Sequence, residues 1–330
     1  MGIVADVLTH DDLDQARHRV RAHLGRTPAR RWPLLEEVTG TETWVKHENH
    51  NPTGAFKVRG GLNFVARLLD EQPDVPGLVA ATRGNHGQSV AYAGAAAGLP
   101  VTIVVPHGNS PDKNAAMAGF EADVVVHGRD YQEAREHAQH LAQERGLVVV
   151  PPFHPWLVAG VATAAEELHQ DVPGLDTVYV PVGMGSGICA QVAVRDLLGA
   201  ATEVVGVVSE QAPAYALSFE AHRPVTTDSA DTFVDGVACR VPDPDALSVI
   251  CAGASRFVRA SEERAEEAMA LMYGATHNLA EPAGSFALAG LLTDLAEDPD
   301  RVRGRRVAVV HTGGNADFPI LRRVMETHRP

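Results

Sequence analysis

The sequence contains three lysines beside 25 arginines, and one of the three, Lys57, lies in a segment suited to amine chemistry. It follows the turn-forming stretch 51–54 and precedes an apolar pattern typical of a helix, so its amine is expected at a helix N-terminus. A cation there opposes the helix dipole, and partial burial lowers its pKa further. Both effects favour the neutral amine that a Schiff-base lysine requires. The alternative interpretation is an ordinary surface lysine in the first turn of a helix.

A second polar segment, 80–89, follows a short apolar run and leads into another helical pattern. Ligands of open α/β sheets bind at the carboxyl ends of strands, and the free N–H groups of a helix start suit a carboxylate or a phosphate. Asn85 and His86 add hydrogen-bonding side chains. We interpret the segment as a candidate anion site, and an ordinary capped turn is the alternative.

The third segment has glycines at alternate positions, Gly183, Gly185 and Gly187, between a strand pattern and a helix pattern. Successive backbone N–H groups in such a loop can hold a phosphate. Ile188 stands where a dinucleotide-binding fingerprint needs its third glycine, and no Gly-Lys-Ser/Thr follows. Glu210, after the next strand, is still placed to bind a ribose, so a nucleotide-dependent oxidoreductase is the alternative from another enzyme class.

A fourth turn, 311–315, follows the last strand pattern. The four turns are therefore expected to share one sheet edge, where an amine, a phosphate-binding loop and two polar turns meet. These are the parts needed to hold a phosphorylated aldehyde cofactor and an amino acid.

The elements that must position these turns alternate along the chain. Short runs rich in valine and isoleucine predict buried strands, and the stretches between them predict helices, which indicates parallel sheet with helices on both faces. The predicted strands are 43–48, 78–81, 101–105, 123–126, 147–150, 178–180, 203–208 and 306–310. The predicted helices are 10–24, 88–97, 131–144, 158–169, 188–198 and 261–272. One group of strands over 78–127 and another from 147 onwards predict two α/β lobes with a cleft between them.

Composition and charge exclude several classes of protein. The 330 residues are 45% hydrophobic and carry a net charge of −14, which indicates a globular protein whose surface repels nucleic acids and anionic membranes. No apolar run approaches the ~20 residues of a membrane span, so we expect a cytoplasmic protein. Cys189, Cys239 and Cys251 have no disulfide or metal-ligand spacing and are expected to be small buried hydrophobic residues.

Taken together, these segments resemble the pyridoxal-phosphate enzymes of the tryptophan-synthase-β fold (fold type II), and within them the threonine and serine dehydratases and serine racemases. The motifs that carry the resemblance occur in the family's order over nearly the whole chain. They are Pro52-Thr-Gly-Ala-Phe-Lys57-Val-Arg-Gly, Arg83-Gly-Asn-His-Gly-Gln88, Gly183-Met-Gly-Ser-Gly187, Glu281-Pro-Ala-Gly284 and Thr312-Gly-Gly-Asn315. The resemblance implies pyridoxal 5′-phosphate in the cleft between a discontinuous large domain, 1–69 with 149–330, and a small domain, 70–148.

The resemblance also implies a role for each site residue. Lys57 would bind the cofactor and act as the catalytic base, with Phe56 beside the ring and Asn85 at the phenolic oxygen. Thr312 would face the pyridine nitrogen, on the same side as Glu281. A hydroxyl there stabilises a pyridinium less than an aspartate would, which favours rapid loss of a β-substituent. The phosphate would be held by Gly183, Met184, Gly185, Ser186 and Gly187, and the substrate carboxylate by Thr82, Arg83, Gly84, Asn85 and His86.

The implied reaction converts a β-hydroxy-α-amino acid, L-threonine or L-serine by default, to a 2-oxo acid and ammonia. A serine racemase and a dehydratase for a larger or acidic β-hydroxy amino acid are the alternatives. Arg83 stands where the family often has a small residue or the serine that racemases use as an acid and base, and an arginine cannot act as a base at neutral pH. Val208 replaces the glutamate of metal-binding members, so we expect no metal, although Glu210 lies nearby. We expect a homodimer with a small-molecule substrate and no nucleic-acid or membrane partner.

Overall fold

Valine-rich runs and longer amphipathic stretches form strands and helices in the computed structural model, which describes residues 8–328. The strands are β1 (Ala29–Arg31), β2 (Glu42–His47), β3 (Leu78–Ala81), β4 (Val101–Val105), β5 (Asp123–Val126), β6 (Val148–Val149), β7 (Thr177–Pro181), β8 (Glu203–Ser209), β9 (Arg256–Ala260) and β10 (Arg306–His311). The helices are α1 (His10–Arg21), α2 (Pro33–Thr39), α3 (Lys57–Glu71), α4 (Asn85–Ala97), α5 (Pro111–Gly119), α6 (Tyr131–Arg145), α7 (Pro155–Asp171), α8 (Ser186–Leu197), α9 (Ala214–Ala221), α10 (Pro244–Gly253), α11 (Glu262–Thr276), α12 (Phe286–Glu297) and α13 (Phe318–Thr327). Short 3-10 helices include η2 (Glu48–His50) and η3 (Asp235–Val237).

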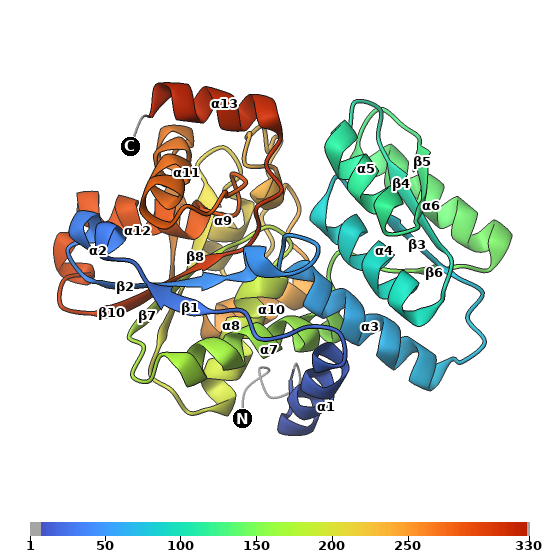
Figure 1. Ribbon diagram of the computed structural model, residues 1–330, viewed down its shortest axis with the longest axis horizontal. Coiled ribbons are helices and arrows are strands. Elements are labelled where there is room, and N and C mark those ends of the chain that lie inside the picture. Colours follow the sequence, from blue (N-terminus) through green and yellow to red (C-terminus); the bar gives the residue numbers. More distant parts are fainter. Residues whose placement is uncertain (1–7, 329–330) are drawn as a thin grey trace.

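The strands form two sheets, which lie in separate lobes (Figure 1). The larger sheet has the order β1-β2-β10-β7-β8-β9, and the smaller has the order β5-β4-β3-β6. Within residues 8–328, every named strand pair is parallel except β1 with β2. The predicted two-lobed, parallel-rich α/β architecture is therefore confirmed.

Both faces of the larger sheet are covered by helices, which explains why its central strands are apolar at nearly every position. Val178 and Val180 of β7 pack in one core cluster with α7, α8 and α10. Tyr179, between them in sequence, points to the opposite face and packs in a second cluster with α11 and α12. This alternation is the two-residue period of a strand, here buried on both sides.

Each predicted strand is present, but one was assigned to the wrong group. Residues 147–150 were expected with the C-terminal strands, whereas β6 pairs with β3 in the smaller sheet. The prediction was wrong because so short a strand carries no sequence pattern that identifies the strand beside it. The first helix ends at Arg21, before the predicted residue 24, and its predicted start is confirmed by a capping box between Thr9 and Asp12.

The free thiols lie as expected for small hydrophobic residues. Cys189 and Cys239 are buried, and Cys251 is half-buried. Within the part of the chain that the structure describes, no helix has the length and apolar character of a membrane span.

Candidate active site

Lys57 is the first residue of α3, as its turn-forming prelude predicts. Its side chain is half-buried and borders a small cavity that is also lined by His86, Val161 and Ser186. Burial lowers the pKa of the Lys57 ammonium to about 8, against an opposing effect of Glu281. Far more of this amine than of an ordinary lysine is therefore neutral near physiological pH, and a nucleophile or base must be neutral.

The first turn of α3 is fixed by two close helix crossings. The Ser89 hydroxyl of α4 donates a hydrogen bond to the Lys57 carbonyl at 2.6 Å, and a Cβ on Gly61 would lie 2.4 Å from the Ser89 oxygen. On the other side, a Cβ on Gly160 of α7 would lie 2.3 Å from the Arg59 carbonyl oxygen. Glycines at both crossings let the backbones approach and hold Lys57 in place.

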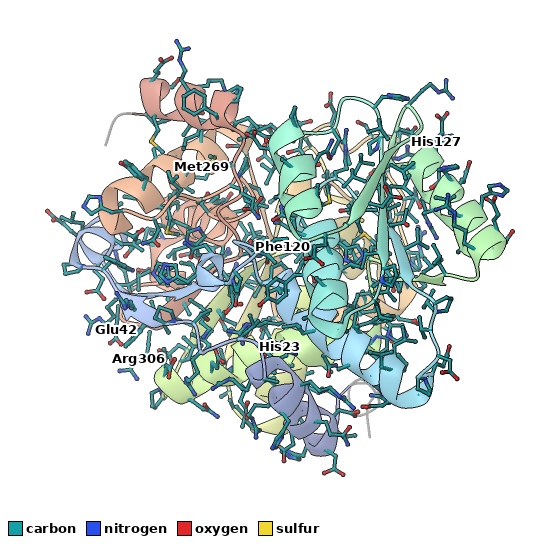
Figure 2. All side chains as sticks on the ribbon, turned by 45° about the vertical axis from the view of Figure 1, so that its right-hand side comes forward. His23, Glu42, Phe120, His127, Met269 and Arg306 are labelled. Carbon is teal, nitrogen blue, oxygen red and sulfur yellow. The ribbon has the colours of Figure 1, made fainter. Side chains whose placement is uncertain are left out.

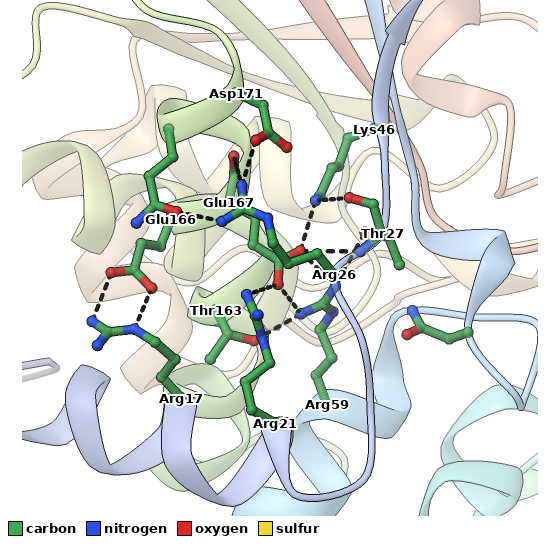
Figure 3. A network of polar contacts seen from close by, with 12 residues as sticks. Arg17, Arg21, Arg26, Thr27, Lys46, Arg59, Thr163, Glu166, Glu167 and Asp171 are labelled. Atoms are coloured by element: carbon green, nitrogen blue, oxygen red, sulfur yellow. Dashed lines mark hydrogen bonds and ion pairs between the residues drawn. The ribbon is translucent and has the colours of Figure 1, made fainter.

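Behind Lys57 lies a buried network of charges, shown in Figure 3. Arg59 pairs with Glu48 at 2.8 Å and with Glu167 at 2.9 Å. Lys46 donates to Glu167 at 2.8 Å and to the Thr27 carbonyl at 2.7 Å. Burial raises the pKa of Glu167, but the two cations outweigh it and bring that pKa to about 2. The other labelled members of the network are Arg17, Arg21, Arg26, Thr163, Glu166 and Asp171.

The glycine-rich loop between β7 and α8 presents backbone rather than side chains. Gly185 has a φ of +96° and caps α8, a conformation that glycine adopts without strain. A Cβ on Gly183 would lie 2.1 Å from the Gly236 carbonyl oxygen. The N–H groups at the start of a 12-residue helix together with this loop suit a phosphate.

Side chains from both lobes meet beside the lysine. The Asn85 amide of α4 donates to Glu281 at 2.5 Å and accepts from Asn315 at 2.8 Å. Burial raises the pKa of Glu281, while Lys113 and Asn85 act to lower it. The site therefore joins residues that are about 200 positions apart in sequence.

Two further predicted site residues, Phe56 and Thr312, are joined through the backbone of the turn at 311–315. The Thr312 hydroxyl donates to the Ala283 carbonyl at 3.0 Å, and the Thr312 carbonyl accepts from the Phe56 N–H at 3.0 Å. The Phe56 ring lies 3.9 Å from where a Cβ on Gly187 would be. The segments that contain Phe56, Gly187 and Thr312 are thus in contact, although each follows a different strand.

The predicted substrate turn is built around Thr82, whose hydroxyl accepts from the N–H groups of Gly84 at 3.0 Å and Gly87 at 3.3 Å. His86 is buried with its Nε2 3.2 Å from the Val150 carbonyl. Burial and the nearby Lys57 lower the pKa of His86 to about 4, so its ring is neutral. Arg83 points instead to Asp235 in η3, with Nη1 3.8 Å from Oδ1.

The structure corrects the expectation that the four turns share one sheet edge. The turn at 82–86 follows β3 of the smaller sheet, whereas the other three follow β2, β7 and β10 of the larger sheet. The site therefore forms where the carboxyl ends of two sheets face each other. Asp235 and Lys113 also lie near this region, and neither was predicted; the presence of just three lysines in the sequence was the signal that could have drawn attention to Lys113.

No metal site emerges from the described residues. Among them, no three His, Cys, Asp or Glu side chains group as metal ligands. Glu210, the position weighed for a cation, is exposed just after β8.

The sequence matches the family described as "Pyridoxal-phosphate dependent enzyme" over residues 20–313. The chain belongs to this family. It is 32% identical to the L-threonine ammonia-lyase of Thermotoga maritima over 321 residues, covering 97% of this chain and 78% of that enzyme. It is 34% identical to the biosynthetic L-threonine dehydratase IlvA of Salmonella typhimurium, covering 91% of this chain but 58% of that enzyme. The processed form of threonine deaminase isoform 2 from Solanum lycopersicum superimposes with a TM-score of 0.88 at 26% identity, over 98% of this chain and 95% of that one.

The residues present fit the cofactor of the pyridoxal-phosphate enzymes. An aldehyde needs a neutral amine, which Lys57 provides, and a phosphate needs converging N–H groups without side chains, which the loop at 183–187 provides. Both border one region, because Lys57 and Ser186 line the same space.

Proposed function

We propose that this pyridoxal-phosphate enzyme is an ammonia-lyase that converts L-threonine or L-serine to the 2-oxo acid and ammonia. The observation that carries the proposal is the half-buried Lys57 amine with a pKa of about 8, which shares one space with the glycine-rich loop. The similarity to L-threonine ammonia-lyase and dehydratases over more than nine-tenths of the chain supports this choice of reaction.

Each residue of the site has a task in this reaction. When bound, pyridoxal 5′-phosphate supplies an electron sink for the pair left at the α-carbon. Lys57 takes the α-proton as general base, and its depressed pKa suits that task. Gly183 to Gly187 hold the phosphate, and the turn from Thr82 to His86 holds the substrate carboxylate at the start of α4. Thr312 keeps a neutral hydroxyl at the ring, and loss of the β-hydroxyl is favoured over longer-lived carbanion chemistry.

The test combines covalent trapping with turnover. Borohydride reduction of the holoenzyme is expected to fix the cofactor on Lys57, and Lys57→Ala is expected to abolish both the adduct and ammonia release while the protein stays folded. Lys113→Arg, which replaces another amine near the site, is the matched control and keeps the adduct. Wild-type ammonia release by Lys57→Ala would falsify the assignment.

The stereochemical outcome follows from Arg83. Racemisation needs a proton donor on the second face of the α-carbon, and a guanidinium stays protonated. Unreacted L-serine recovered during turnover is expected to contain at most a trace of the D-epimer by chiral chromatography. Epimer formation as fast as 2-oxo acid formation would make the racemase the better assignment.

We further propose the two-domain division stated above, with the small domain extended through Val149 because β6 pairs with β3. The three free cysteines support a cytoplasmic enzyme.

We also propose a homodimer. Leu34 and Val38 are exposed on α2, which packs against α11, and they support a homodimer contact on that face. Light scattering coupled to gel filtration measures the assembly, and a single-chain mass of 35.1 kDa would contradict the dimer.

A further inference from the structure

Two cations of the smaller lobe, Arg83 and Lys113, lie beside the predicted substrate turn without a close partner. The Arg83 Nη1 is 3.8 Å from one carboxylate oxygen of Asp235, and the Lys113 Nζ is 3.7 Å from the other. The second carboxylate near Lys113 belongs to Asp317, at 4.0 Å. Among residues 8–328, neither cationic side chain donates a hydrogen bond, so their donors are available to a ligand.

These cations flank the turn that the proposed function assigns to the substrate. Gly84 directly follows Arg83, and a Cβ on Gly84 would lie 3.0 Å from the Lys113 side chain. The Lys113 side chain is only 13% exposed, so most of it is buried beside the turn. Lys113 also lowers the pKa of the buried Glu281, against the effect of burial, and Glu281 accepts a hydrogen bond from Asn85 of the same turn region.

Asp235 shows that a carboxylate can lie between the two cations. Its carboxylate lies between a guanidinium and an ammonium, yet both distances exceed the roughly 2.7–2.9 Å typical of a charge-assisted hydrogen bond. It comes from the irregular segment around η3 in the other lobe, and 41% of its side chain is exposed. At these distances Asp235 makes no hydrogen bond to either cation, so both keep donors for a ligand carboxylate.

We infer that Arg83 and Lys113 form a subsite for a second carboxylate, carried on the β-carbon of the substrate. The preferred substrate is then a β-hydroxy-α-amino dicarboxylic acid. The inference rests on the proposed function, in which the backbone N–H groups of the turn from Thr82 to His86 hold the α-carboxylate at the start of α4, while the Arg83 side chain is directed to Asp235. The methyl group of threonine and the hydrogen of serine offer nothing to two cations, whereas a β-carboxylate matches them in charge.

The chemistry is that of the proposed function and needs no further reactant. Lys57 takes the α-proton as the α C–H bond breaks. The β C–O bond then breaks, and the hydroxyl gains a proton and leaves as water. The resulting enamine takes a proton at the β-carbon to become an imine. Addition of water releases ammonia and a 2-oxo dicarboxylic acid, with no net oxidation.

The first experiment compares kcat/KM of the holoenzyme for threo- and erythro-3-hydroxyaspartate with that for L-threonine and L-serine. We expect one 3-hydroxyaspartate isomer to exceed both by about tenfold to 100-fold, the value of a hydrogen-bonded charge. Arg83→Ala should lower this preference by a similar factor, and Arg83→Lys should restore part of it. Arg129→Ala is the matched control, because Arg129 is an exposed arginine of the same lobe whose partner is Glu133.

The second experiment measures binding without turnover. Calorimetry of the holoenzyme with succinate and butyrate is expected to show tighter binding of the dicarboxylate, weakening as salt is added. Asp235→Asn removes the competing carboxylate and should tighten succinate binding several-fold, whereas Arg83→Ala should weaken it. These opposite signs distinguish a ligand subsite from an interlobe ion pair, for which both changes would act alike.

The outcomes separate the two proposals. Ammonia release from threonine at least equal to that from every 3-hydroxyaspartate isomer, with a preference that Arg83→Ala leaves unchanged, overturns the dicarboxylate inference and leaves the proposed function standing. Absence of both ammonia from every hydroxy amino acid and a borohydride adduct on Lys57 overturns the proposed function itself. Equal binding of succinate and butyrate overturns the subsite whatever the turnover shows.

Discussion

Two groups of charges surround Lys57, one behind α3 and one in front of it, and they differ in closeness and in burial. Behind, Arg59 meets Glu48 and Glu167 at 2.8 and 2.9 Å, and its side chain is 0% exposed. In front, Arg83 is 54% exposed and lies 3.8 Å from Asp235. The close, buried pairs are built to hold the fold, whereas the long, exposed pair leaves its charges open to exchange partners.

The physical reason lies in desolvation. A buried ion that loses its partner keeps the full cost of leaving water, so a buried network is stable only when every member is paired. A partly exposed ion remains hydrated, so leaving it loosely paired costs little. The buried ions around Arg59 therefore require close partners, whereas the partly exposed ions around Arg83 do not.

The largest effect is expected from breaking the buried group. Arg59→Met should lower the free energy of unfolding by about 3–5 kcal/mol, because Glu48 and Glu167 are left buried without their guanidinium. Denaturant unfolding followed by circular dichroism measures it. Arg129→Met, at an exposed pair, should cost at most about 1 kcal/mol. Similar losses in the two variants would show that closeness and burial do not separate the groups.

Lys57 is intermediate in burial between Arg59 and Arg83, and burial depresses its pKa to about 8. Below that pH the amine is protonated and cannot attack an aldehyde. The rate at which cofactor-free protein incorporates pyridoxal 5′-phosphate should therefore rise with pH and level off above about 8, rather than near the ~10.4 of an ordinary lysine. Stopped-flow absorbance at a series of pH values gives the midpoint, and a midpoint near 10 would contradict the burial.

A smaller effect is expected where α7 crosses α3. Gly160→Ala would place a Cβ 2.3 Å from the Arg59 carbonyl oxygen, so the helices must separate, at a cost of about 1–3 kcal/mol. Gly119→Ala is the matched control, since nothing lies within 4 Å of a Cβ at that helical position. Thermal unfolding compares the two, and equal melting temperatures would mean that the crossing yields without cost.

The smallest effect is expected in front of the lysine. Arg83→Ala should change the free energy of unfolding by less than about 1 kcal/mol, because its one ion pair is long and partly exposed. Chemical denaturation of the variant used for the substrate experiments provides the number. A loss as large as that of Arg59→Met would make Arg83 part of the structural framework.

Local patterns predicted the elements and turns better than they predicted contacts. Val178 to Val180 and the glycines from Gly183 identify β7 and its loop, because strand burial and backbone conformation are written in neighbouring residues. The pairing of β6 with β3 and the approach of Asp235 to Arg83 depend on how distant segments fold back, which no local period encodes. Family resemblance supplied the roles of the motif residues, but Lys113 lies outside those motifs.

The burial of the three lysines also determines which amines a modifying reagent can reach. Lys46 is wholly buried in the network, Lys113 is nearly buried beside the predicted substrate turn, and Lys57 is half-buried in the site. The outer surface therefore presents arginine as its strong cation and no fully exposed lysine amine. Amine-directed acylation or crosslinking has little to act on besides the α-amino group and the site itself, so such reagents become reporters of access to the site.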